Sequence, residues 1–183
     1  MIGSALALAQ RAGLPEALRV LLADYPRAAW PQHENFAGLV AFWLDRHLMF
    51  RQLTEALRED AEARIDNRID PQAHVRRLGR FGAMLVDQLH GHHQIEDLHY
   101  FPKLAGLEPR LQRGFELLDS DHHAMDALLS RFSEAADGVL QGGEAGAFHT
   151  ELQGFAGLLN RHLVDEEELI VPVILRHGAQ GLG

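Results

Sequence analysis

The sequence contains no cysteine among its 183 residues. This absence excludes disulfide bonds, thiolate zinc sites, iron–sulfur clusters and a catalytic thiol. Positive charge is also scarce, because 26 acidic residues outnumber 17 lysines and arginines and leave a formal net charge of −9. Binding to nucleic-acid phosphates requires a basic face. We therefore expect no nucleic-acid partner.

Long hydrophobic runs are missing as well. The best run extends only from Leu39 to Leu44, whereas a membrane-spanning helix needs about 20 apolar residues. The N-terminus has no basic residues ahead of its short apolar stretch, which Gln10 and Arg11 interrupt, so it does not resemble a secretory signal. These features predict a cytoplasmic protein with no membrane partner.

What the sequence does contain is helical periodicity. Apolar residues recur at three- and four-residue spacings in four long segments, and turn residues separate these segments. The expected helices span residues 36–69, 71–102, 109–141 and 146–174, with Gly178 as the C-terminal stop. We predict an all-α fold in which residues 36–177 form an up-down-up-down four-helix bundle.

The flanking residues are expected to belong to the same domain. Residues 1–35 are predicted to form a short N-terminal helical extension of two helices, separated near Gly13, and residues 178–183 form a tail. The second of these helices should begin around Pro15 and end at Tyr25-Pro26. The extension is a candidate contact for a homodimer, although nothing in its sequence favours that role over packing across the bundle.

Histidine is abundant, with 12 copies. Four lie near the ends of predicted helices, where we expect them to be exposed: His33, His74, His149 and His177. The other eight lie within the long segments: His47, His90, His92, His93, His99, His122, His123 and His162.

Two helices share a histidine–acid pattern. Glu96 follows His92 by four residues, Glu166 follows His162 by four, and a proline stands six residues after each glutamate. Residues at i and i+4 lie on one face of a helix, so each pair can offer an imidazole and a carboxylate to the same metal ion. The repetition of this pattern is stronger support for a metal site than either pair alone.

The positions of the histidines along the bundle axis also indicate a metal site. Counted from the intervening turns, His47, His92, His122 and His162 fall within about three helical turns of one level. Unpaired polar groups inside a bundle cost about 1–3 kcal/mol each. Four histidines converging on one level are therefore predicted to bind metal.

These residues resemble the hemerythrin-like (HHE cation-binding) family of di-iron four-helix bundles over roughly residues 36–177. The matching pieces are Asp45-Arg46-His47, His92-His93-x-x-Glu96-Asp97 with Phe101-Pro102, Asp121-His122, and His162-x-x-x-Glu166-Glu167 with Pro172.

The resemblance implies two iron ions bridged by the carboxylates of Glu96 and Glu166. His47 and His92 would bind one iron, and His122 and His162 the other, as the resemblance implies. Glu167 is the alternative bridge, because some members place this acid five residues after the histidine. Imidazole and carboxylate donors suit iron, with zinc and manganese as alternatives.

One position departs from the oxygen-carrying members. They have a fifth histidine one turn before the third-helix ligand, where this sequence has Leu118. His99, Asp119 and Asp126 are the candidate replacements. The expected function is binding of dioxygen, nitric oxide or peroxide as a sensor, scavenger or store. The alternatives are an enzyme that turns over peroxide or oxidises a substrate, and a regulatory helical module with a structural metal.

A ferritin-like di-iron bundle is the rival interpretation. Glu96-x-x-His99 has the spacing of its i, i+3 motif, and Asp119-x-x-His122 is a partial second copy. That architecture needs a carboxylate on the first helix at the metal level, where this sequence offers His47, so we rank it lower. The remaining histidines of the central helices are expected to point away from the ligand faces and to be exposed or outer partners of ligands: His90, His93 and His123. His93 could still orient Asp97 or a partner.

Overall fold

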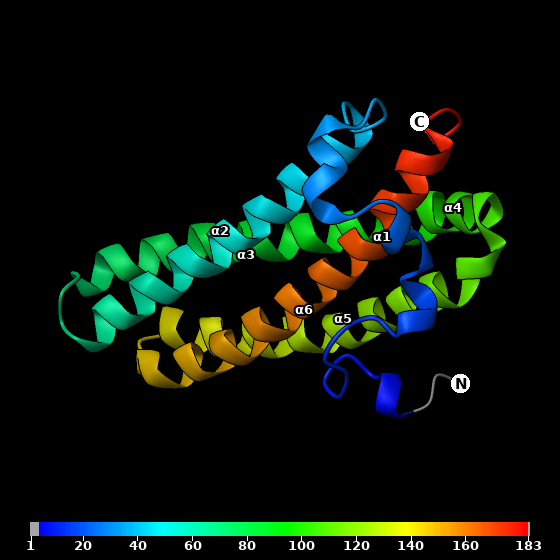
Figure 1. The fold of residues 1–183 in the computed structure, drawn as a ribbon. Coiled ribbons are helices and arrows are strands. Elements are labelled where there is room, and N and C mark those ends of the chain that lie inside the picture. The colour runs from blue at the N-terminus through cyan, green and yellow to red at the C-terminus, as the bar shows by residue number, and fades with distance from the viewer. Residues whose placement is uncertain (1–3, 183) are drawn as a thin grey trace. The chain divides into compact units, whose positions relative to one another are not determined.

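The computed structural model describes residues 4–182, and every regular element in this range is helical (Figure 1). The all-α prediction is therefore confirmed. The first three residues of the expected N-terminal extension and the last residue of the expected tail lie outside the described range.

The N-terminal extension is more broken than the two predicted helices. Its four short pieces are the 3-10 turns η1 (Ser4–Leu6), η2 (Glu16–Leu18) and η3 (Arg27–Gln32), and the helix α1 (Val20–Asp24). Pro15 and Pro26 directly precede two of these pieces. Proline has no backbone N–H and cannot continue a helical hydrogen-bond ladder, which explains why the extension does not form longer helices.

The long helices agree with the predicted segments. They are α2 (Leu39–Ile65), α3 (Pro71–Ile95), α5 (Gln112–Leu140) and α6 (Ala145–His177), with η4 (Glu96–Tyr100), α4 (Phe101–Leu107) and η5 (Pro109–Leu111) between α3 and α5 (Figure 1).

The turns follow from local chemistry. After α2, Asn67 adopts the left-handed conformation with φ 55°, which asparagine tolerates better than most residues. The side chain of Asp70 then accepts a hydrogen bond of 2.8 Å from the backbone N–H of Ala73, and Pro71 is the first residue of α3. This arrangement satisfies a free N–H at the start of the helix. Gly178, with φ 75°, ends α6 as predicted.

Helix α3 continues into a π turn. In η4, the N–H of Phe101 donates to the carbonyl of Glu96, five residues earlier. Pro102 explains this widening, because it has no N–H to offer the preceding turn and its ring would crowd a regular α-helix there. Isolated π turns are frequent at functional sites, and this one begins at Glu96.

The chain divides into two compact units, to which the long helices contribute different parts. The first unit comprises residues 1–47, 93–123 and 161–183, and the second comprises residues 48–92 and 124–160. The first unit therefore includes the N-terminal extension, η4, α4 and η5.

The interior of the second unit is largely apolar. The ring of Phe132 lies 5.5 Å from the rings of both Phe148 and Phe155, measured between centroids. Leucines of α2 and α3, including Leu57 and Leu85, are fully buried as well. Helical periodicity alone accounts for this packing.

The interior of the first unit combines apolar packing with polar groups. Its hydrophobic cluster includes Trp30 from η3, Trp43 from α2 and Leu118 from α5. Helices α5 and α6 approach closely at Gly114, where an added Cβ would lie 2.7 Å from the side chain of Leu169. Leu118 is fully buried within this cluster, so the position where the oxygen carriers have a histidine serves packing here.

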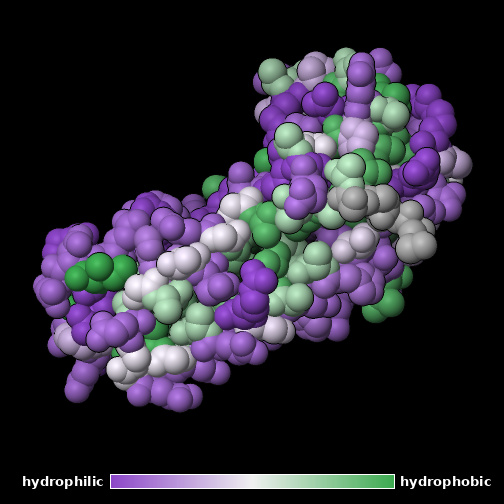
Figure 2. Space-filling view, turned by 90° about the horizontal axis from the view of Figure 1, so that it is seen from below, coloured by the Kyte–Doolittle hydropathy of each residue, from purple (hydrophilic) through white to green (hydrophobic). Residues whose placement is uncertain are grey.

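The surface is largely hydrophilic on the face shown in Figure 2, as expected from the acidic composition. Within residues 4–182, no helix has both the length and the apolar character required to cross a membrane.

Candidate metal centre

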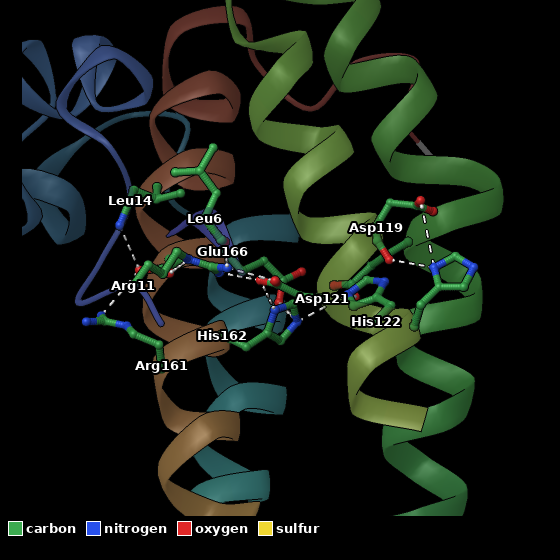
Figure 3. Close-up of polar contacts among 12 residues, drawn as sticks. Leu6, Arg11, Leu14, Asp119, Asp121, His122, Arg161, His162 and Glu166 are labelled. Carbon is green, nitrogen blue, oxygen red and sulfur yellow. Dashed lines mark hydrogen bonds and ion pairs between the residues drawn. The ribbon is translucent and has the colours of Figure 1, made fainter. Parts of the chain in front are cut away.

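Four histidines meet inside the first unit, one from each long helix. His47 comes from α2, His93 from α3, His122 from α5 and His162 from α6, and none is more than 3% exposed. Figure 3 shows His122 and His162 side by side between their helices. The sequence predicted His92 at this level, whereas the structure places its neighbour His93 among the buried histidines.

Two buried glutamates lie among these histidines. The Oε2 atom of Glu166 is 3.5 Å from Nε2 of His47 and 3.5 Å from Nε2 of His162. Glu96 Oε2 is 3.7 Å from Nε2 of His122, and Glu96 Oε1 accepts a hydrogen bond of 2.6 Å from the indole of Trp43. Each carboxylate therefore points toward an imidazole from another helix, and Glu166 also faces His162 on its own helix.

His93 differs from its sequence-based expectation. It is 3% exposed, and its ring stacks on that of His122 with centroids 3.9 Å apart. His93, His122 and His162 each offer a ring nitrogen, and the three nitrogens lie within 4.8 Å of one another. The expectation that His93 points away from the ligand face was wrong. Its position directly after His92 was the only signal in the sequence.

A carboxylate lies close to the Nδ1 atom of three of these histidines. The Nδ1–carboxylate pairs are His47–Glu167 at 3.0 Å, His122–Asp97 at 2.7 Å and His162–Asp121 at 3.3 Å. A carboxylate at Nδ1 favours the tautomer that has its proton on that nitrogen and leaves a lone pair on Nε2. Metal-ligating histidines commonly have this arrangement.

With the proton on Nδ1, the Nε2 lone pairs of these histidines face other hydrogen-bond acceptors. Nε2 of His122 lies 3.2 Å from Nε2 of His162, and carboxylate oxygens of Glu96 and Glu166 are close to the same atoms. Lone pairs and carboxylates at these distances repel one another unless a cation or protons lie among them. The interior is therefore built to hold positive charge.

Burial shifts two of these groups toward their neutral forms. Burial raises the pKa of Glu96 to about 8, although hydrogen bonds with Glu166 and Trp43 act in the opposite direction. Burial also lowers the pKa of His162 to about 4, opposed by its hydrogen bond with Asp121. A neutral imidazole is the form that binds a metal ion.

Two arginines from the N-terminal extension reach the outer carboxylates. Arg11 forms a buried ion pair with Asp121 (Figure 3) and donates from Nε to Asp165 at 2.8 Å. Arg27 donates from Nη1 to Glu167 at 2.6 Å. No helical pattern or histidine spacing indicated either arginine, because both contacts join segments that are far apart in the sequence.

The other predicted ligands are placed as follows. His92 is the last residue of the second unit, where its ring lies 5.3 Å from that of Phe50. Glu167, the alternative bridge, contacts His47 at Nδ1 and Arg27. A carboxylate at Nδ1 of His47 is suited to orienting that ring.

The three candidate replacements for a fifth histidine lie outside the cluster. His99, Asp119 and Asp126 are all exposed. Asp119 lies beside His123. None of the three belongs to a group of potential metal ligands among residues 4–182. The structure instead brings His93 to the ring of His122.

The donor set and a comparison with known families lead to the same conclusion. Imidazole nitrogens and carboxylate oxygens without sulfur are suitable ligands for iron, zinc or manganese. Residues 38–174 match the hemerythrin HHE cation-binding domain, a range that includes all four converging histidines and both glutamates. No curated protein and no solved structure matches the chain. The chain therefore belongs to the hemerythrin HHE cation-binding domain family.

Proposed function

We propose that the protein binds two iron ions and, through them, a small ligand such as dioxygen, nitric oxide or peroxide. The observation that carries this proposal is the convergence of imidazole Nε2 atoms on buried carboxylates, with Nδ1 of three histidines held by a further carboxylate. The order of the long helices and their short connections further support the up-down-up-down bundle that we propose for residues 36–177.

The ligands fall into two proposed sets. His93, His122 and His162 would hold one ion, and their mutual distances support this assignment. His47 and His92 would hold the other ion. The i, i+4 spacing of His92 and Glu96 along one helix supports the place of His92 in this second set.

Glu96 and Glu166 are the proposed shared ligands. Glu166 lies 3.5 Å from a histidine of each set, which supports a bridging role. Glu96 Oε2 lies 3.7 Å from Nε2 of His122, and Glu96 follows His92 by four residues, which supports the same role for this second carboxylate. Iron in such a site supplies redox chemistry and an affinity for diatomic ligands.

The unequal histidine counts support the binding of a small ligand. With His93 included, one set has three histidines, whereas the other has only His47 and His92. An ion held by fewer protein ligands would keep a position for a molecule from solution. Beside His47, Glu166 and Glu167, this side is lined by buried apolar side chains that include Trp43 and Val171, which favours small uncharged ligands over larger substrates.

The test is metal analysis of anaerobically reconstituted protein, followed by spectra before and after exposure to oxygen or nitric oxide. We expect about two irons per chain and an absorption change when the ligand is added. His122→Ala should lose bound iron. The matched control His123→Ala replaces the exposed neighbour and should retain it. A protein that takes up no iron would contradict the proposal, and uptake of zinc without any redox response would favour a structural metal.

A further inference from the structure

The N-terminal extension contributes a buried charge to the interior of the first unit. The Arg11 side chain is 3% exposed, and its guanidinium donates to both Asp121 and Asp165. Its Nη1 atom also donates to the backbone carbonyl of Leu6, 3.0 Å away. A buried arginine that satisfies two buried carboxylates is costly to remove, because the acids would be left without compensation.

A second, half-exposed arginine of the extension also contacts a buried carboxylate. Arg27 donates to Glu167 at 2.6 Å, and its guanidinium lies 4.6 Å from the ring centroid of Trp30. Trp30 is buried and anchors η3 in the hydrophobic cluster of the first unit. The guanidinium of Arg27 is therefore held by both Trp30 and Glu167.

Hydrogen bonds to the backbone also join the residues around Arg11 to α6. The N–H of Leu14 donates to Asp165 at 3.2 Å, and Arg161 donates to the carbonyl of Ala12. Figure 3 shows Arg11, Leu14 and Arg161 gathered on one side of His162. Asp165 thus joins the extension to the helix that carries His162 and Glu166.

Each arginine ends a chain of contacts that leads to a different proposed metal ion. One chain runs from Arg11 through Asp121 to Nδ1 of His162, and the other runs from Arg27 through Glu167 to Nδ1 of His47. Carboxylates at this position orient the imidazole and increase its basicity. The arginines in turn fix the carboxylates and offset their charge in the buried interior.

We propose that the N-terminal extension is a clamp on the metal centre, in which Arg11 and Arg27 are positioning residues for His162 and His47. This inference rests on the proposed function, because it requires that the histidines bind metal. Docking of the extension and binding of metal are then thermodynamically coupled, so each must strengthen the other by the same factor.

The first experiment measures metal affinity. Apoprotein is titrated with Co²⁺ against a competing chelator, for the wild type and for Arg27→Gln, Arg11→Gln and Arg11→Lys. We expect each glutamine variant to weaken Co²⁺ binding about 10- to 100-fold, the effect typical of removing outer partners of metal ligands. Arg19→Gln is the matched control, because Arg19 lies in the same extension and is exposed, and it should leave the affinity unchanged.

Two further readouts separate a positioning role from loss of folding. At saturating Co²⁺, the visible absorption bands should shift in Arg27→Gln, since the geometry of a ligand has changed, and Arg27→Lys should restore them in part. Hydrogen exchange of residues 6–32 should slow when Co²⁺ binds the wild-type protein. If Arg11→Gln fails to fold, Arg27→Gln and Arg11→Lys still test the inference, because Arg27 is half-exposed and lysine retains the charge.

The outcomes distinguish the two proposals. Wild-type protein that binds no Co²⁺ and no iron would overturn both the proposed function and the clamp. Wild-type protein that binds metal, with variants of equal affinity, unchanged spectra and metal-independent exchange of the extension, would overturn the clamp alone.

Discussion

The two units of the molecule draw on the same four long helices, yet their interiors are opposite in character. In the second unit, aromatic and aliphatic side chains such as Phe132 and Phe155 fill the centre. In the first unit, histidines and acids occupy equally buried positions, including His162 and Glu166, which are fully buried. The backbone is helical in both units, so the difference lies in the side chains and in the partners that each buried polar group finds.

His74 shows what a buried histidine looks like without such a set of partners. It belongs to the second unit and is 1% exposed, and neither ring nitrogen has a hydrogen-bond partner in the described part of the chain. We expected it to be exposed, which was wrong. It lies four residues before Leu78 on α3 and therefore shares the inward face of that helix. In contrast, His162 has Asp121 at Nδ1 and Glu166 near Nε2.

The largest expected effect comes from breaking the apolar interior. Phe132→Ala removes a ring that packs against Phe148 and Phe155 and should lower the free energy of unfolding by about 3–5 kcal/mol. Urea denaturation with and without a chelator should show the same loss, because the second unit's core is independent of metal. Ser130→Ala, at an exposed position, is the control. If Phe132→Ala lowered the free energy of unfolding only in the metal-loaded protein, the core of the second unit would not be independent of metal.

Removal of metal should have the next largest effect, and it should act through the first unit. At a free iron concentration of about 100 times its dissociation constant, binding should stabilise the fold by about 2.7 kcal/mol. Glu166→Gln should lose most of this stabilisation, because it removes a charge that faces two histidines. Glu134→Gln is the matched control at an exposed position of the second unit and should retain it. Equal stabilisation of both variants would argue against Glu166 as a ligand.

The smallest effect concerns the pH dependence of stability. Burial lowers the pKa of His74 below its ordinary value of 6.5, an effect increased by Arg64 and opposed by Asp60. Below about pH 6.5, the unfolded chain binds a proton at His74 that the folded chain does not. The free energy of unfolding therefore decreases as the pH falls below about 6.5.

His74→Leu should therefore reduce the loss of stability at acidic pH. The measurement is the free energy of unfolding of chelator-treated protein at pH 5 and pH 7.5, by urea denaturation. An unchanged difference between the two pH values would show that His74 does not contribute.

Much of the architecture could be predicted because it depends on local patterns. The periodicity of apolar residues located the four long helices, and Asp70-Pro71 and Gly178 marked ends that the structure confirms. The repeated His–Glu spacing identified α3 and α6 as carriers of ligand candidates, since i and i+4 share a helical face. The assignment of individual ligands stays a prediction, which the distances around Glu166 support.

The remaining features depend on contacts between distant segments, which spacing within one helix does not encode. The inward position of His93 depends on the packing of α3 beside His122. Arg11 was visible in the sequence only as an interruption of an apolar stretch, and its buried pairing with Asp121 appears when the extension folds onto α5 and α6.

The sequence by itself determined the helical class, the family and the kind of chemistry that the interior can support. The helical class and the chemistry follow from residue type and short spacings, namely imidazole and carboxylate donors in the absence of cysteine. The family follows from the match of residues 38–174 to the hemerythrin HHE cation-binding domain. The tertiary structure alone decided which polar groups are buried together and which arginines accompany them. The physical reason is that desolvation and pairing of charges depend on neighbours in space, and Arg11 and Asp121 become neighbours only in the folded chain.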